Sequence, residues 1–395
     1  MKKSLFMAGL MSLAMVALVG CNKENNAPSA DGAEATVSIK LQGAQMRAAT
    51  YEPGKGDADK KIYTLAAMVY NGDVQEAYKA ADADATEITD IRCTAGDRKL
   101  VVVANFGTEK LEGLSLTELQ AKTLELATAQ QNPESKLHMM TSEVQGVVIA
   151  AGKNVYGKKT DDPNDNEINA EKPLMITHVH AGMEFQKITV DFKSTFAAKY
   201  SINLEEQTKI IGLIVKKQSK IFGNPLAFGD KFVYGEEHFG ISDKKYTPAK
   251  ENYTEEVSLM KPFLKDDYTS AGFYILENNS DKHPTILTLK TPLLDNTGKA
   301  LEGTAKDQAI AAGYCDEEGF TYYPVLVNWT KDGYTYVEGD NNKRNVIERN
   351  HKYQISMNIT GPGTNQPEDP TNEPATLDVT ITVAPWVLVA QNVEW

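Results

Sequence analysis

The sequence predicts a mainly β protein made of two β-sandwich domains, with a short helix insertion and further strands at the C-terminus. Short apolar runs such as "KIYTLAAMVYNG" and "RKLVVVANFG" recur along the chain and end in Asn or Gly, which is typical of strands followed by turns. The runs do not alternate with helices in a βαβ rhythm, and this favours sandwiches over a parallel sheet. A chain of 395 residues is long enough for two or three domains with separate cores.

The first twenty residues have the features of an export signal. Lys2 and Lys3 precede an apolar run that ends at Val19, and Gly20 and Cys21 follow. This pattern predicts a lipoprotein signal peptide over residues 1–20, after which Cys21 is lipidated and becomes the new N-terminus. The alternative, a membrane span, is disfavoured because the apolar run is too short to cross a bilayer. The polar stretch after Cys21 suits a tether between membrane and fold.

A strand followed by a cleavable linker is expected next, within a propeptide over residues 21–47. Val37, Ile39 and Leu41 alternate with polar residues, which indicates a half-buried strand. The stretch "AQMRAAT" then surrounds an arginine with small or flexible residues, so we expect a protease to cut between Arg47 and Ala48. That cut would detach the strand together with its lipid.

The first domain is expected over residues 48–182 and includes one helix. Ser115 and Glu118 form a capping box, and the helix is predicted to extend from Ser115 to Gln131. Its buried face should hold Leu116, Leu119, Thr123 and Leu126. The acidic stretch "GKKTDDPNDNEINAEKP" is expected to be a long surface loop, and strand periodicity restarts near Gly182.

The second domain is expected over residues 183–365, with linker and terminal strands over 366–395. The runs "KIIGLIVKKQ", "GFYILEN", "PTILTLK", "TYYPVLVNW" and "HKYQISMNITG" predict its strands. The proline-rich stretch from Gly361 to Pro374 should be an extended, semi-rigid linker with more reach than folding back requires. Beyond it, apolar residues again alternate with polar ones up to the last residue.

Such a C-terminus predicts burial against another molecule, because chain ends are usually polar and frayed. Loss of the strand holding Val37, Ile39 and Leu41 would open a groove in the first sandwich, and the C-terminal segment of a second copy could fill it. Head-to-tail donation does not close on itself and gives filaments. Which of the two terminal strands is donated stays open. The candidate donor residues are Val383, Trp386, Val387, Val389, Val393 and Trp395.

The sequence gives no support for catalysis, a metal or a cofactor. Common nucleotide, hydrolase and zinc-protease motifs do not occur. His178 and His180 share one strand face, but no third metal ligand is near, so hydrogen-bonded histidines at a domain junction are the favoured interpretation. The acidic loop lacks the glycine and spacing of an EF-hand, so a solvated loop is favoured over calcium binding; its carboxylates are Asp161, Asp162, Asp165 and Glu167.

The net charge argues against one class of partner, and the cysteine spacing argues against a disulfide framework. A net charge of −13 and a pI near 5.1 argue against a nucleic-acid partner, which requires a basic surface. Cys93 and Cys315 lie far apart in the sequence, so we expect two small buried side chains rather than a disulfide framework.

The chain resembles the FimA-type major fimbrillins, the shaft subunits of long adhesive fimbriae in Gram-negative oral anaerobes. The resemblance covers nearly the whole length, through "GCNKEN", "MVYNG", "LVVVAN", "LIVKKQSKIFG", "GFYILEN", "YYPVLVN", "IERNHKYQISMNITGPGTNQPE" and "VAPWVLVAQNVEW". It implies transthyretin-like, Greek-key sandwiches and an outer-membrane lipoprotein precursor with a fatty acid on Cys21. Cleavage after Arg47 by an Arg-specific protease and donation of Ala375–Trp395 are also implied.

The resemblance further implies a surface fimbrium with accessory tip and anchor subunits, adhesion to host extracellular proteins and other bacteria, biofilm formation and virulence. Two other classes of protein fit the sequence less well. A glycan- or protein-binding β-sandwich lipoprotein that does not polymerise would need an aromatic platform, yet two of the three tryptophans lie in the terminal segment. A secreted hydrolase would need a catalytic constellation that the sequence does not provide.

Overall fold

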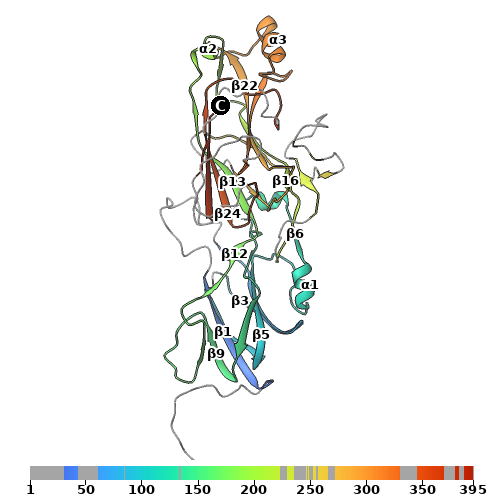
Figure 1. The fold of residues 1–395 in the computed structure, drawn as a ribbon, viewed down its shortest axis with the longest axis vertical. Coiled ribbons are helices and arrows are strands. Elements are labelled where there is room, and N and C mark those ends of the chain that lie inside the picture. Colours follow the sequence, from blue (N-terminus) through green and yellow to red (C-terminus); the bar gives the residue numbers. More distant parts are fainter. Residues whose placement is uncertain are drawn as a thin grey trace, which may run out of the picture.

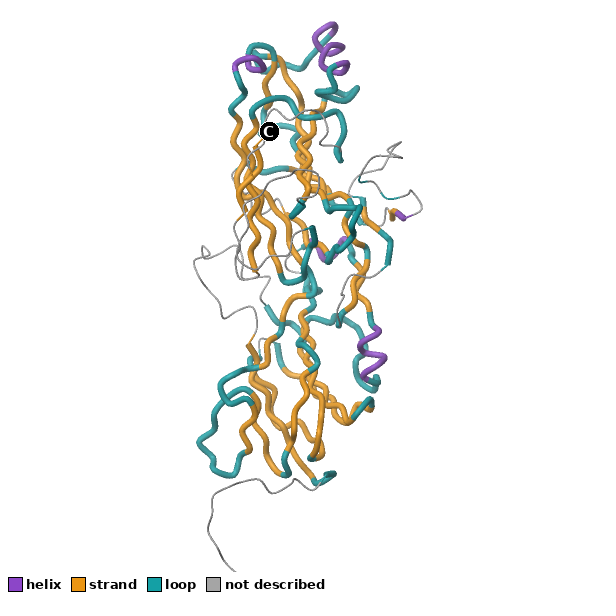
Figure 2. Tube along the Cα trace, in the orientation of Figure 1, coloured by secondary structure: helices purple, strands orange, loops and turns teal. Residues whose placement is uncertain are grey.

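Two β-sandwiches stacked end to end form an elongated molecule, and strands make up most of it (Figures 1 and 2). The structure is a computed structural model. It describes residues 31–42, 61–83, 85–132, 135–222, 229–234, 246, 248, 252–254, 257–265, 272–329 and 345–368, and the backbone of residues 379–381 and 387–394.

The N-terminal sandwich has two sheets. The first contains β1 (Glu34–Gln42), β4 (Glu87–Thr94), β9 (Gly152–Tyr156), β10 (Asn166–Ile168) and β11 (Leu174–Met175). The second contains β2 (Leu65–Asn71), β3 (Val74–Ala81), β5 (Gly96–Ala104), β7 (Met140–Thr141), β8 (Gln145–Ile149) and β12 (Thr177–His178). Apolar residues of both sheets meet in one buried core, with β1 and β4 on one side and β2 and β5 on the other.

The C-terminal sandwich follows the same plan. One sheet contains β13 (Ala181–Val190), β21 (Gly272–Ile275), β24 (His351–Ile359), β25 (Val379–Ile381) and β26 (Val387–Glu394). The facing sheet contains β14 (Tyr200–Ile202), β15 (Lys209–Leu213), β20 (Met260–Pro262), β22 (Ile286–Asp295) and β23 (Phe320–Leu326). A small third sheet contains β16 (Val215–Lys216), β18 (Phe232–Val233) and β19 (Tyr253–Thr254). The mainly β fold expected from the sequence is therefore confirmed.

The helices are short and lie outside the sheets. They are α1 (Leu116–Ala121), α2 (Ser194–Ala197), α3 (Gly303–Ala311) and the 3-10 turn η3 (Thr128–Gln131). The capping box at Ser115 and Glu118 is present, but the predicted helix to Gln131 is wrong, because α1 ends at Ala121. The following residues form β6 (Thr123–Glu125), which pairs with β17 (Gln218–Lys220) from the C-terminal half. Pairing between the two halves therefore overrides the local helical pattern.

The two sandwiches are joined by more than the connecting chain. Besides the β6–β17 pair, the side chain of Gln131 makes two hydrogen bonds with the backbone of Tyr274: its Nε2 donates to the carbonyl over 2.8 Å, and its Oε1 accepts from the amide over 3.0 Å. Ile221 and Phe222 pack into a cluster that otherwise belongs to the N-terminal half. The junction is thus a packed, hydrogen-bonded contact.

Candidate functional site

The first strand, β1, is an interior strand of its sheet. On one side it pairs antiparallel with β4, from Glu34 opposite Thr94 to Lys40 opposite Glu87. On the other side it pairs parallel with β9 and then, at Leu41 and Gln42, with β11. A strand with partners on both sides is normally fixed in its sheet, and its loss would leave unpaired backbone on both neighbours.

The predicted apolar face of β1 lies in the core. Val37 and Ile39 are completely buried, Leu41 is 3% exposed, and Ala35 is 5% exposed. Full burial of each larger side chain is worth about 1.5–3 kcal/mol, so the three together contribute substantially to the stability of the sandwich. The alternation in the sequence therefore predicted the buried face of β1 correctly. It did not predict that β1 lies between two partner strands.

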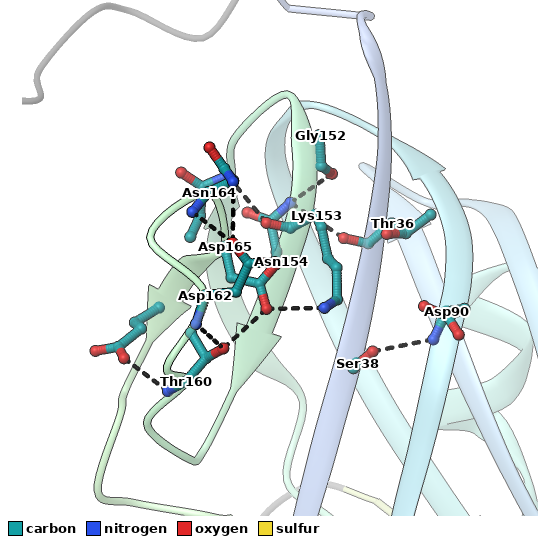
Figure 3. Close-up of polar contacts among 12 residues, drawn as sticks. Thr36, Ser38, Asp90, Gly152, Lys153, Asn154, Thr160, Asp162, Asn164 and Asp165 are labelled. Atoms are coloured by element: carbon teal, nitrogen blue, oxygen red, sulfur yellow. Dashed lines mark hydrogen bonds and ion pairs between the residues drawn. The ribbon is translucent and has the colours of Figure 1, made fainter.

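Two polar contacts fix β1 against its neighbours, one on each side (Figure 3). On the β4 side, the Asp90 backbone N–H donates to Oγ of Ser38 over 3.0 Å. On the β9 side, Nδ2 of the buried Asn154 donates to the Thr36 carbonyl over 3.1 Å. Sequence reasoning missed both contacts. The only signal was a hydroxyl residue, Ser38, between two apolar ones.

The Asp90 contact lies at a β-bulge. Val37 is opposite Ile91, whereas Ile39 is opposite Ile88, so β4 has one more residue than β1 between these pairs. Asp90 has φ 52°, a left-handed conformation that is uncommon outside glycine and Asn or Asp. Bulges leave a residue out of the ladder. Here the Asp90 N–H lies outside the ladder and donates to the Ser38 hydroxyl oxygen instead.

The acidic loop between β9 and β10 is held by its own hydrogen bonds. Lys153 Nζ lies 2.8 Å from Oδ2 of Asp165, which also accepts from the Thr160 hydroxyl (Figure 3). These donors hold the pKa of the Asp165 carboxyl below its usual range, with the Lys153 hydrogen bond as the largest cause. Asp162 accepts from Asn164, and Glu167 accepts from the Thr160 backbone. These three carboxylates therefore already have donors within the loop.

Several predicted site residues lie outside the described part of the chain. They are the lipidation and cleavage residues Cys21, Arg47 and Ala48, and the donor residues Val383, Trp386 and Trp395. Lipidation and the cleaved bond therefore remain predictions.

The two terminal strands pair with β24 of the same chain. β25 runs antiparallel along Ile355–Met357, and β26 runs parallel to β24, with Val387 opposite His351 and Val389 opposite Tyr353. The other edge of β24 pairs with β13. In this monomer the C-terminal strands thus complete their own sandwich, and donation to a neighbour would require them to leave β24.

The linker prediction needs a correction. Gly361–Glu368 is not an extended spacer, because it packs on the C-terminal sandwich. Thr364 exchanges two backbone hydrogen bonds with Tyr322 at 2.8 and 2.9 Å. The Tyr234 hydroxyl donates to Oε2 of the buried Glu368 over 2.5 Å. A free linker can begin only after Glu368, so its reach is shorter than the sequence indicated.

The predicted pair of histidines lies at the junction of the sandwiches, and a third histidine joins them. His178 and His180 are fully buried, and the His180 ring meets the His138 ring edge-on at 5.6 Å. Burial lowers the pKa of His178 to about 3 and the pKa of His180 well below its usual range. The expectation that both are hydrogen-bonded is wrong for His180, whose ring nitrogens have no hydrogen-bond partner in the described part.

Other candidate chemistry is sparse. Among the described residues, no cluster of three or more His, Cys, Asp or Glu side chains could hold a metal ion. Cys93 and Cys315 are buried, and burial raises the pKa of each thiol to about 11, which leaves both as poor nucleophiles. The described helices include none with the length and apolar content needed to span a bilayer.

Comparison with known proteins shows the class to which this elongated two-sandwich chain belongs. Residues 35–178 match the family described as major fimbrial subunit protein (FimA), and residues 180–386 match the FimA4 pilin C-terminal domain. The chain belongs to the FimA family of major fimbrial subunits. Its role is therefore that of a structural subunit of cell-surface fimbriae, which is not an enzyme class.

Individual relatives agree over the full length. The chain is 40% identical over 404 residues to major fimbrium subunit FimA type-2 of Porphyromonas gingivalis, and 41% identical over 406 residues to the type-4 subunit of the same species. Both alignments cover 100% of each chain. The crystal structure of a fimbrilin from P. gingivalis W83 is similar with a TM-score of 0.76 and 37% identity, covering 91% of this chain and 96% of that one.

Proposed function

We propose that this subunit is made as a lipoprotein anchored through Cys21, and that it polymerises after an Arg-specific protease cuts between Arg47 and Ala48. The cut frees residues 21–47, and with them β1, from a mature chain of two sandwiches over 48–182 and 183–365. Segment 366–395 of a second copy then supplies a strand for the vacated place. Filaments form because donor and acceptor sites lie on different parts of each copy.

The observation that supports this proposal best is the position of β1. Val37 and Ile39 are fully buried, and the strand has partners on both sides, yet the chain reaches Arg47 only a few residues after β1 ends at Gln42. One cut in the connection therefore separates an interior strand from the rest of the molecule. While it is tethered, β1 outcompetes a strand from another molecule because its effective concentration is on the order of millimolar or more.

The proposal extends to partners. Growth requires other copies of the subunit, and tip and anchor subunits would start and end the filament. On this proposal the finished fimbrium adheres to host extracellular proteins and to other bacteria, and it supports biofilm formation. The described residues do not assign a receptor-binding surface.

Replacing the cleavage arginine tests the switch. An Arg47→Ala precursor should stay monomeric after treatment with an Arg-specific protease, because β1 remains tethered. Arg92→Lys is a matched control, since Arg92 lies on β4 and is exposed; it should polymerise like the parent. Size-exclusion chromatography and electron microscopy would report the products. Equal polymerisation of Arg47→Ala and the parent would contradict the proposal.

A further inference from the structure

The two strands that form the walls of the β1 groove would be left in unequal states by the loss of β1. β9 also pairs with β10, from Asn154 opposite Asn166 to Tyr156 opposite Ile168, and this ladder does not involve β1. Among the described strands, β4 forms a ladder with β1 alone. Once β1 has left, the β9 wall of the groove therefore keeps a partner in its sheet, whereas the β4 wall keeps none.

The backbone bonds just beyond the ends of β4 come from the same departing segment. The Leu41 N–H donates to the Thr86 carbonyl over 3.0 Å, and the Ala95 N–H donates to the Ala33 carbonyl over 2.8 Å. Some of the core around the apolar side chains of β4 leaves at the same time, because β1 and β4 contribute to one cluster. A segment with few remaining backbone bonds and contacts opens easily. β4 therefore needs other contacts if it is to stay in place.

Two cationic side chains connect β4 to the opposite sheet. Lys79, on β3, donates through Nζ to the Thr89 carbonyl of β4 over 2.6 Å. Arg98, on β5, donates through Nη2 to the Ala95 carbonyl over 2.9 Å and to the Thr94 hydroxyl. Hydrogen bonds from charged donors are stronger than those between neutral groups. All of these residues lie beyond the proposed cut, so the cut does not remove the contacts.

The arginine is itself fixed on the opposite sheet. Its side chain is 2% exposed, and its Nε donates to Oε2 of Glu76 on β3 over 2.7 Å. Asp31, which lies 3.9 Å from Nη2, would leave with residues 21–47, but the bonds to Glu76, Thr94 and Ala95 would stay. β4 is thus connected to the opposite sheet in its middle and at its C-terminal end.

We propose that Lys79 and Arg98 are positioning residues of the groove, which hold β4 in place while the position of β1 is empty. This inference rests on the proposed function. A strand from segment 366–395 of a second copy can pair on both sides only if both walls remain where β1 left them. If β4 moved away, β9 would be the only partner in that sheet, and the other edge of the incoming strand would stay unpaired.

The first test separates the acceptor role of a subunit from its donor role. An Arg47→Ala precursor keeps β1 and can only donate, whereas a cleaved subunit can accept. Cleaved Lys79→Met lacks the donor to Thr89, so it should take up labelled Arg47→Ala precursor, supplied in excess, about threefold less well than the cleaved parent. Lys79→Arg should restore uptake. The matched control is Lys99→Met, an exposed lysine on β5, which should behave like the parent. Size-exclusion chromatography measures the uptake.

The reciprocal mixture tests for general damage. An Arg47→Ala/Lys79→Met precursor should donate to the cleaved parent as well as Arg47→Ala does, because its C-terminal segment is unchanged. A defect in both roles would overturn the assignment of Lys79 to the groove, and so would equal uptake by cleaved Lys79→Met and Lys99→Met. Failure of the cleaved parent to take up any precursor would instead overturn the proposed function, and this inference with it.

The second test measures the position of β4 and includes Arg98. Spin labels on Arg92→Cys of β4 and Val148→Cys of β8, both at exposed positions, report the distance between the two sheets by electron paramagnetic resonance. Arg98→Lys keeps the charge but loses the planar fork that reaches Glu76 and Ala95 together. All precursors should give one narrow distance distribution.

After cleavage and separation from residues 21–47, the distribution should stay narrow in the parent and widen in Arg98→Lys and Lys79→Met. If the Arg98→Lys precursor does not fold, Lys79→Met gives the same comparison. A distribution as narrow in the cleaved variants as in the cleaved parent would overturn the proposal and leave strand exchange standing.

Discussion

β1 and β26 are the first and last described strands of the chain, and their sheets hold them in different ways. β1 lies between β4 on one side and β9 and β11 on the other. Within the described part of the chain, the paired neighbour of β26 is β24 alone. Loss of β1 opens the middle of a sheet, whereas loss of β26 exposes one edge.

This difference explains how one chain could hold one end firmly and release the other. An interior strand leaves only when two ladders and a buried face open together, which is a near-global event. An edge strand can open locally at a much smaller free-energy cost. On the proposed function, a covalent cut is therefore needed near β1 and not near the C-terminus. On the proposed function, the firmly held strand is the switch and the loosely held segment is the donor.

The largest expected effect is a contrast between matched alanine variants of the two strands. Ile39→Ala should lower the free energy of unfolding of the precursor by about 2–5 kcal/mol, because it leaves a cavity in a closed core. Val389→Ala should lower it by less than Ile39→Ala does, because β26 pairs with the single neighbour β24, whereas β1 lies between two partners. Urea denaturation of both proteins measures the difference. Similar losses would mean that β26 is as integral as β1, contrary to the comparison.

A second effect concerns whether the two sandwiches separate from each other when the pH is lowered. His178, with its pKa lowered to about 3, stays neutral in the folded junction, while in the unfolded chain it binds a proton near pH 6.5. The contribution of neutral His178 is therefore present above pH 6.5 and is lost as the pH falls from 6.5 toward 3. Besides burial, the groups that lower the pKa values of His178 and His180 are cationic or basic, and they include His138, Lys352 and Arg349.

The measurement is the pH dependence of the unfolding midpoint between pH 7 and pH 4. The parent should lose up to about 1.4 kcal/mol per pH unit for each histidine that becomes charged on unfolding. His178→Gln should flatten this slope, because glutamine does not take up a proton in either the folded or the unfolded chain. Two separate transitions in the parent at low pH would show that the junction opens before either sandwich unfolds. An unchanged slope in His178→Gln would contradict the role of this residue.

The strands were largely predictable because each buries one face, and burial imposes a period of two on the sequence. Val37, Ile39 and Leu41 were placed correctly for this reason. The helix was predicted too long because β6 pairs with β17, a contact between residues about ninety positions apart that no local pattern can encode. The linker was misjudged for a similar reason, since Glu368 is fixed by Tyr234 from a distant part of the chain.

The polar part of the candidate site could not be predicted. The Asp90 bulge depends on how two strands align, and a single sequence does not state that alignment. Asn154 lies in an ordinary polar stretch, and its importance follows from the Thr36 carbonyl that it reaches. His138, at the junction, is brought to His180 only by the packing of the two sandwiches. Apolar periodicity therefore predicted the core of the site, and its hydrogen bonds required coordinates.

The smallest expected effect tests whether exposed contacts beside β1 contribute to holding it. The Lys153–Asp165 ion pair links β9 to the acidic loop; the lysine side chain is 48% exposed, and the Asp165 side chain is 3% exposed. Water and salt reach the pair from the lysine side and screen it, and Asp165 also accepts from the Thr160 hydroxyl, so the pair contributes little. Lys153→Met should therefore leave the thermal midpoint of the precursor almost unchanged and should not speed its conversion by the protease. Asn154→Ala, on the same strand, should lower the midpoint clearly, because it removes the buried donor to the Thr36 carbonyl and leaves the Ala150 backbone without its partner. If Lys153→Met destabilised the precursor as much as Asn154→Ala, the surface loop rather than the buried ladder contacts would hold β1, and the contrast between an interior strand and an edge strand would lose its explanation.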